Sequence, residues 1–123
     1  MRAEIDDLAM QGISAQVDSE ALKGHLDLLL MAALRQQPGY GYEVLGRIKE
    51  MSGGEFDVPE GTVYPALHRL QRRGCLKSSW EVANGRRRRV YRITARGERE
   101  FAGRRDAWER FSTGISRALG ASG

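Results

Sequence analysis

The chain has 123 residues, of which 41% are hydrophobic, and a formal net charge of +4. This length suits one domain with a small core, which a second subunit would help to stabilise. With no run of about 18 apolar residues and no signal-peptide pattern, the sequence predicts a cytoplasmic protein that does not contact a membrane. Cys75 is the only cysteine, which excludes an internal disulfide and a cysteine metal site.

The positive charge is concentrated in one part of the chain. Residues 59–105 contain 13 Lys or Arg against four Asp or Glu, whereas residues 1–20 contain one Arg against five acidic residues. Such clustering favours a polyanionic partner. Nucleic acid is favoured over a membrane surface, because no basic amphipathic helix with an apolar face accompanies the basic segment.

Residues 1–18 mix polar residues, glycine and scattered apolar residues, which predicts a partly ordered N-terminal arm. Ile5, Leu8 and Ala9 would suit a short helix packed on a partner subunit, and disorder is the alternative. In the ordered case we expect Leu8 at the subunit interface.

Two helices are predicted before residue 52. The first runs from Ser19 to the Pro38-Gly39 stop, and its apolar residues keep helical spacing. The second covers residues 41–51, ends at Gly53-Gly54 and buries Val44, Leu45 and Ile48. Together they provide a scaffold for the helix that follows.

A third predicted helix lies between Pro59 and Gly74. Its core-facing side is marked by apolar residues at i, i+4 and i+7, namely Val63, Leu67 and Leu70. The opposite side is basic and aromatic and carries Tyr64, His68, Arg69 and Arg72. Two starts are open, because either Pro59-Glu60 begins the helix or Asp57 and Glu60 form a capping box.

Pro65 lies inside this helix, where its ring meets the carbonyl of the residue four positions earlier. That residue is Gly61, which can absorb the distortion. We expect a bent first turn that presents Thr62, Tyr64 and Pro65 outward, towards DNA. Tolerance of a proline without any role is the alternative.

The next turn carries the residues best placed to meet nucleic acid. Arg69 and His68 would reach base edges, and arginine suits the two acceptors of guanine. Arg72 and Arg73 would meet phosphates.

A β-hairpin is predicted next. Its first strand has alternating positions that share one face, namely Leu76, Ser78, Trp80 and Val82. Asn84-Gly85 favours a type I′ turn, because both residues need positive φ. Of the arginines at 86–89, we expect Arg86 and Arg87 near the tip to reach phosphates or the minor groove and Arg88 and Arg89 to be partly structural. The alternative is a solvated run of charge.

A helix followed by an arginine-tipped hairpin is the plan of a winged helix-turn-helix, in which the helix suits the major groove and the wing suits the flanking backbone. We therefore predict a mainly α fold, with this DNA-binding domain over residues 19–94 and a two-stranded β wing. The candidate DNA-contacting residues are Tyr40, Thr62, Tyr64, Pro65, His68, Arg69, Arg72, Arg73, Lys77, Arg86, Arg87 and Arg88.

The last predicted helix, over residues 95–119, has Thr94 as its N-cap. At about 1.5 Å per residue it spans roughly 37 Å, more than one small domain needs. Its larger apolar residues follow a seven-residue spacing typical of two packed helices. We predict a homodimer whose interface contains Leu8, Phe101, Trp108, Phe111, Ile115 and Leu119. A core stripe within one chain is the alternative.

These motifs resemble the PadR family of bacterial transcriptional regulators. The resemblance rests on residues 61–70, on residues 87–94 with Gly97, on Tyr40-Gly41-Tyr42-Glu43 and on Trp108. It implies a dimeric, ligand-responsive repressor, and the short C-terminal part resembles the small subgroup with one C-terminal helix. Pro59-Glu60 departs from the family pattern, which often has a Ser/Pro pair at this place.

The resemblance also implies a role for Trp108. In multidrug-sensing PadR-like regulators the matching tryptophans line a pore between subunits, where flat aromatic compounds stack. A planar aromatic effector is thus implied at the two-fold axis, and packing alone is the alternative.

The predicted function is that of a ligand-responsive repressor, which binds a two-fold-related DNA operator as a homodimer. The alternative is a winged-helix module for protein–protein interaction that does not bind DNA. With His25 and His68 as the only histidines and without phosphate-loop or metal-ligand spacing, the sequence predicts no catalytic, metal or cofactor site.

Overall fold

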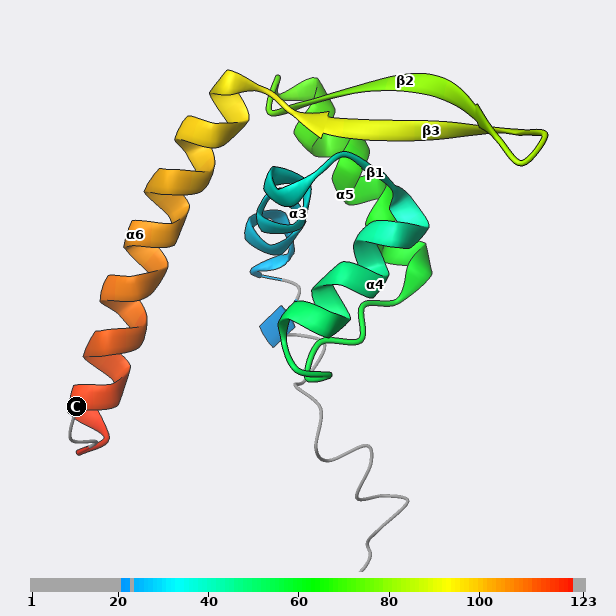
Figure 1. The fold of residues 1–123 in the computed structure, drawn as a ribbon. Coiled ribbons are helices and arrows are strands. Elements are labelled where there is room, and N and C mark those ends of the chain that lie inside the picture. Colours follow the sequence, from blue (N-terminus) through cyan, green and yellow to red (C-terminus); the bar gives the residue numbers. More distant parts are fainter. Residues whose placement is uncertain (1–20, 23, 121–123) are drawn as a thin grey trace, which may run out of the picture.

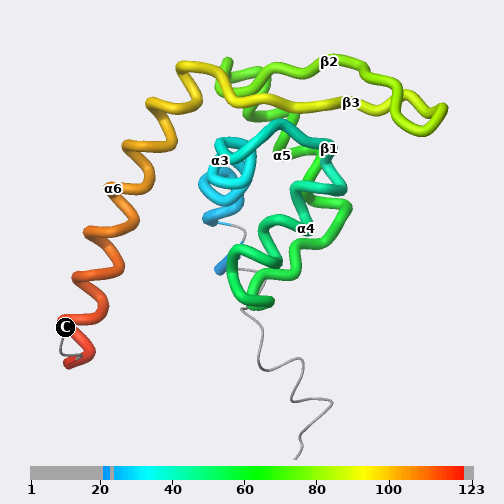
Figure 2. The backbone as a smooth tube through the Cα atoms, in the orientation of Figure 1, coloured from blue at the N-terminus to red at the C-terminus, as the bar shows by residue number. Residues whose placement is uncertain are grey.

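Local sequence signals set most element boundaries in this chain. The structure, a computed structural model, describes residues 21, 22 and 24–120. In chain order the elements are α3 (Leu26–Gln36), β1 (Gly39–Tyr40), α4 (Gly41–Met51), α5 (Glu60–Arg72), β2 (Leu76–Ala83), β3 (Arg86–Ile93) and α6 (Ala95–Ala118). Figure 1 shows α3, α4 and α5 grouped in a helical body, from which the β2–β3 hairpin and α6 extend in different directions; Figure 2 traces the same path. The fold is a mainly helical winged helix-turn-helix, as predicted.

The first predicted helix differs from the expectation. Residues 21 and 22 are helical, but a turn at Gly24 follows, and α3 begins at Leu26. Glycine readily leaves the helical conformation, and the apolar spacing contains no signal of this interruption. The expected start at Ser19 and the N-terminal arm with Leu8 lie outside the described residues.

Arg47 joins α4 to the end of α3. Its Nη1 donates hydrogen bonds to the carbonyl oxygens of Ala33 at 3.2 Å and Gln37 at 2.6 Å, and its Nη2 donates to that of Pro38 at 2.8 Å. The last carbonyls of a helix have no partner within the helix, so Arg47 satisfies this end of α3. α4 itself has the bounds predicted from the sequence.

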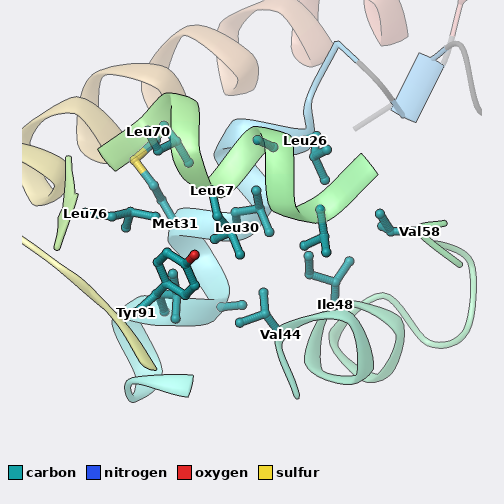
Figure 3. Packing of buried hydrophobic residues seen from close by; sticks show 14 of the residues in the cluster. Leu26, Leu30, Met31, Val44, Ile48, Val58, Leu67, Leu70, Leu76 and Tyr91 are labelled. Carbon is teal, nitrogen blue, oxygen red and sulfur yellow. The ribbon is translucent and has the colours of Figure 1, made fainter. Parts of the chain in front are cut away.

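The core lies between α3, α4, α5 and the inner part of the sheet, and Figure 3 shows its packing. The apolar side predicted for α5 is fully buried and consists of Val63, Leu67 and Leu70. Of the three residues expected in the core from α4, Val44 and Ile48 are buried and Leu45 is half-buried. The core therefore fixes which side of α5 faces outward.

The sheet is antiparallel and has the strand order β1–β3–β2. At the turn between β2 and β3, Asn84 has a φ of 54° and Gly85 a φ of 75°. Positive φ at both residues is what a type I′ turn requires, so the predicted hairpin is confirmed. β1 adds a third strand to the two expected ones, and at two residues it is too short to produce a period-2 pattern.

The first half of α6 packs on its own chain. Phe101, which was predicted for the dimer interface, is only 7% exposed and belongs to the core. The guanidinium groups of Arg35 and Arg105 lie 4.6 Å and 5.4 Å from its ring centroid. A seven-residue spacing does not distinguish packing within a chain from packing between chains. The other predicted residues of this row are exposed, namely Trp108, Phe111, Ile115 and Leu119.

Charged side chains fasten α6 to α3 and α5. The Asp27 carboxylate on α3, whose side chain is 12% exposed, lies 2.6 Å from Arg69 Nη2 on α5 and 3.9 Å from Arg104 Nη2 on α6. Glu100 on α6 accepts a hydrogen bond from Arg104 Nε at 2.9 Å and pairs with Arg73 at the end of α5. These five residues are called the Asp27–Glu100 cluster below.

Glu100 is ionised in this cluster. Burial alone would raise its pKa, but hydrogen bonds from Cys75 and Arg104 and the charges of Arg73 and Arg104 outweigh burial and lower the pKa. The stability that Glu100 contributes is thus present at neutral pH and is lost as the pH falls through this lowered pKa. Cys75 is buried, and burial raises the pKa of its thiol, so the thiolate that redox chemistry needs is disfavoured.

The start of α6 approaches the chain closely at one glycine. Thr94 Oγ1 accepts a hydrogen bond from the backbone N–H of Gly97 at 3.0 Å, which confirms the predicted N-cap. A Cβ atom added at Gly97 would lie 2.2 Å from the carbonyl oxygen of Cys75. Only glycine fits there without a movement of backbone.

This close approach generates a prediction about stability. Gly97→Ala should lower the free energy of unfolding by about 1–3 kcal/mol or more, because the methyl group overlaps backbone rather than a movable side chain. Gly103→Ala is the matched control, since a Cβ atom there meets nothing within 4 Å. Alanine is the better helix former, so the control should raise stability by roughly 0.5–1 kcal/mol. Urea denaturation measures both; equal changes in the two variants would contradict the close approach.

Candidate nucleic-acid interface

The start of α5 is settled by its contacts. Pro59 precedes the first helical residue, Glu60, and the Thr62 hydroxyl donates a hydrogen bond to the Pro59 carbonyl oxygen at 2.8 Å. The alternative capping box at Asp57 does not form, because Pro59 and not Asp57 occupies the cap position; the Asp57 carboxylate lies 4.0 Å from Lys49 Nζ. Pro59-Glu60 therefore begins this helix.

Pro65 does not interrupt α5, which continues to Arg72. A Cβ atom at Gly61, four residues earlier, would meet nothing within 4 Å, so glycine is not needed there to make room for the proline ring. Thr62, Tyr64 and Pro65 are exposed, as the sequence predicts. Their contact with DNA stays a prediction.

Tyr64 lies over the first residue of α4. A Cβ atom at Gly41 would come within 2.7 Å of the Tyr64 ring, so glycine leaves the space that this ring occupies. Tyr40, directly before Gly41, pairs with Val90 of β3. This contact brings the start of α4 and the exposed side of α5 to the base of the wing.

Aromatic and basic side chains border one hollow between α5 and the wing. Its volume is about 400 Å³, and it is lined by Tyr40, Tyr42, Tyr64, His68, Trp80, Arg87, Arg88, Arg89 and Tyr91. Five of these residues were predicted to contact DNA, and they come from three separate segments of the chain. The structure therefore brings together much of the predicted surface.

Arg69 and Arg73 lie elsewhere. Both belong to the Asp27–Glu100 cluster, and their guanidinium groups contact α3 and α6 rather than the hollow under the wing. The prediction that Arg69 shares one side of α5 with Tyr64 and His68 is therefore corrected. Arg72 is exposed at the end of the helix.

The wing extends beyond the core, so its apolar residues are exposed. The exposed fractions of Trp80 and Val82 are 53% and 72%. The guanidinium groups of Arg87 and Arg89 lie 4.7 Å and 5.0 Å from the Trp80 ring centroid, on the same face of the hairpin. Cation–π contacts of this length are attractive, so two of the wing arginines pack on the Trp80 ring.

The remaining basic residues of the wing have different surroundings. Arg86 is exposed beside the turn, and Arg88 lies over Tyr40, with 5.1 Å between its guanidinium carbon and the ring centroid. Lys77 is exposed on β2 and pairs in register with Arg92. Lys77 therefore lies on the face of the hairpin opposite to Trp80.

The sequence interpretation missed Tyr42, Trp80, Arg89 and Tyr91 as residues of the hollow. Burial raises the pKa of the Tyr91 hydroxyl, and the charge of Arg89 partly opposes this shift. A register assignment for the hairpin would have found two of the four residues, because an Asn-Gly turn at 84–85 places Trp80 opposite Arg89. Tyr42 carries no local signal that separates it from an ordinary exposed helix residue.

The described part of the chain comprises residues 21–120 apart from residue 23. No group of three or more His, Cys, Asp or Glu side chains in this part of the chain is placed to hold a metal ion. None of the helices that the structure describes is long and apolar enough to cross a membrane.

Comparison with known proteins connects this geometry to a family. The model of the transcriptional regulator PadR-like family matches residues 29–103, which include α5 and the wing. A transcriptional regulator of Mycobacterium tuberculosis is 44% identical over 61 residues, which are 50% of this chain and 57% of that protein.

Solved structures agree with this match. A transcriptional regulator from Clostridium thermocellum has a TM-score of 0.74 and 28% identity, over 82% of this chain and 96% of that one. Bacillus subtilis PadR, solved in complex with operator DNA, shares the fold with a TM-score of 0.58 and 22% identity, over 63% of this chain and 45% of that one. The chain therefore belongs to the PadR-like family of transcriptional regulators.

Proposed function

We propose that this chain is a ligand-responsive repressor that binds a two-fold-related DNA operator as a homodimer. The observation that carries the proposal is the hollow where the exposed side of α5 meets the aromatic and arginine face of the wing. Winged helix-turn-helix proteins use the helix in the major groove and cations on the flanking phosphates. The operator complex of Bacillus subtilis PadR, a protein of the same fold, supports the proposal.

The residues fall into two roles under this proposal. Base edges and nearby phosphates are contacted by the exposed side of α5, which presents Thr62, Tyr64, Pro65, His68 and Arg72. The flanking backbone is contacted from the wing and its base by Tyr40, Lys77, Arg86, Arg87 and Arg88. Arg69 and Arg73, whose side chains are 48% and 41% exposed, would reach DNA only by exchanging a carboxylate of the Asp27–Glu100 cluster for a base or a phosphate. Arg104, 3.9 Å from Asp27, would then remain as the cation beside that carboxylate.

Substitution of Arg69 and substitution of Arg87 should therefore change DNA binding in different ways. Arg69→Ala should weaken binding at the cognate site by about 1–3 kcal/mol and relax its sequence preference. Arg87→Ala should weaken binding to all sequences similarly and lower the salt slope by about one per subunit. Fluorescence anisotropy at several salt concentrations, with an operator found by genome-wide mapping and with a scrambled duplex, measures both effects.

Asp27→Asn is the control that separates DNA contact from helix packing. It removes the carboxylate partner of Arg69 and keeps the guanidinium, so it disturbs the cluster without removing the proposed contact. If Asp27→Asn relaxes the sequence preference as much as Arg69→Ala does, then Arg69 acts through the fold and not through a base. Failure of the unaltered protein to bind any duplex would favour the protein–protein module instead.

The proposed homodimer rests on the outer part of α6. Trp108, Phe111, Ile115 and Leu119 are 44–80% exposed and recur at helical spacing along one side of the helix. Exposed apolar rows of this size mark interaction sites in soluble proteins. A second copy of α6 presents the same row, so an isologous contact would bury both.

Charge placed in this row should prevent association. Phe111→Glu combined with Ile115→Glu should give a monomer at micromolar concentration, because the contact would then bury carboxylates without partners. Arg110→Glu combined with Arg117→Glu is the matched control, since these exposed residues line the polar side of α6 together with Asp106 and Thr113. Sedimentation velocity measures both; a monomeric unaltered protein contradicts the dimer.

Ligand response is proposed to act at Trp108. Trp108 borders two hollows. One, of about 250 Å³, lies between α3 and α6 and has Arg104 and Phe111 in its lining, and the other, of about 360 Å³, extends to the segment between α4 and α5. The second is lined by Ala21, Leu22, His25, Leu28, Leu29, Phe56 and Trp108. A mostly apolar lining with an exposed indole suits a planar aromatic molecule. A ligand wedged there would change the position of α6 and thereby the separation of the two α5 helices of a dimer.

Titration with planar cationic dyes tests the effector site. In a Trp80→Phe background, where Trp108 is the remaining tryptophan, dye binding should quench the fluorescence with saturation. In the protein that keeps Trp80, the same dye should weaken operator binding by about tenfold or more. Trp108→Ala should abolish the quenching in a protein that stays dimeric. Quenching without a change in operator binding would show that Trp108 is a packing residue and not part of an effector site.

A further inference from the structure

Arg89 differs from the arginines beside it in the wing. Its side chain is half-buried, and its Nε donates a hydrogen bond to Ser78 Oγ at 3.0 Å. The Ser78 hydroxyl in turn donates to Gln71 Oε1 at 3.0 Å. One hydroxyl can accept and donate at the same time, so these bonds form a continuous chain from the last turn of α5, across β2, to β3.

The same guanidinium group contacts Trp80. The register of the hairpin pairs Trp80 with Arg89, and Arg87 lies two residues along β3 on the same face. The ring of Trp80 is thus contacted by Arg89 at 5.0 Å and by Arg87 at 4.7 Å. The exposed indole of Trp80 therefore provides a surface on which the side chains of Arg87 and Arg89 pack, which restricts their rotamers.

β1 pairs with β3 only at Val90 and Tyr91, so the part of the hairpin towards its tip has two strands and few contacts that hold its direction. Lys77, Ser79 and Glu81 lie on the other face of β2 and are exposed. The chain of hydrogen bonds is therefore a direct side-chain link between the exposed wing and the helix proposed to enter the major groove. A side chain that is ordered before binding loses less entropy on binding.

We propose that Gln71, Ser78, Arg89 and Trp80 form a positioning relay that fixes the wing relative to α5 and holds Arg87 ready for a DNA phosphate. This inference rests on the proposed function and deepens it. Arg89 is a positioning residue, and its charge serves the relay and not a phosphate. The four consecutive arginines of the wing thus divide into backbone-contacting residues near the tip and a structural residue at its base.

Ser78→Ala tests the relay without removing charge. It should weaken operator binding about fivefold, as expected for one lost hydrogen bond, and leave the salt slope unchanged. Ser79→Ala is the matched control, because Ser79 is exposed on the opposite face of the same strand. Ser78→Thr keeps the hydroxyl and should restore the affinity. If Ser78→Ala binds as tightly as the unaltered protein, the relay is wrong.

The salt dependence of DNA binding then separates Arg89 from Arg87. Arg89→Gln should weaken binding with an unchanged salt slope, whereas Arg87→Gln should lower the slope by about one per subunit. An equal fall of the slope in both variants would show that Arg89 contacts a phosphate, which would overturn its assignment as a positioning residue.

A measurement without DNA keeps this inference distinguishable from the proposed function. In a Trp108→Phe background, Trp80 is the remaining tryptophan, and its time-resolved fluorescence anisotropy reports the motion of the wing. Ser78→Ala and Arg89→Gln should both increase the amplitude of the fast component, and Ser79→Ala should not. If they do so in a protein that binds no duplex, the relay stands and the proposed function fails; if neither changes the anisotropy, the relay fails whatever the protein binds.

Discussion

The partly buried carboxylate of Asp27 is the constraint on which the arrangement of the helices depends. A carboxylate removed from water must be compensated by cations or hydrogen bonds, and Asp27 is 12% exposed. Its partners, Arg69, Arg73 and Arg104, come from α5 and α6. Because α3 carries the carboxylate, three helices distant in sequence are held in one orientation. The direction of α6 follows from this orientation, whereas the buried Val63, Leu67 and Leu70 fix which side of α5 is exposed.

Much of the fold could be predicted because its signals are local. The Asn-Gly turn at 84–85, the Thr94 cap and the apolar spacing of α5 each depend on residues within a few positions of one another. The candidate site could be predicted to the same extent, because part of it is the exposed side of a predicted helix and another part is the tip of a predicted hairpin.

The sequence could not show which residue a side chain contacts when the possible partners lie far away in the chain. In the sequence, Arg69 looks like a residue that contacts DNA bases. Its ion pair with Asp27, which lies 42 positions earlier, leaves no pattern in the neighbouring sequence. The spacing of Phe101 is equally compatible with a dimer interface and with the core of its own chain, where it is buried. Helical spacing shows which side of a helix is covered, but not which element covers it. The run of arginines likewise shows where charge lies, whereas the register with β2 decides which arginines meet Trp80.

Two networks lead away from α5, and they differ in chemistry. Towards α6, the link is ionic and runs through Asp27 and Glu100, and the contribution of Glu100 is lost as the pH falls through its lowered pKa. Towards the wing, the link runs through the hydroxyl of Ser78 and the amide of Gln71, which do not titrate. Under the proposed function, a ligand beside Trp108 displaces α6 and acts on the ionic link first, because Arg104 lies one turn before Trp108 on the same helix. The wing can then keep its position relative to α5 while α5 moves relative to α6. A ligand would therefore change the spacing of the two DNA-contacting units of a dimer without dismantling either unit.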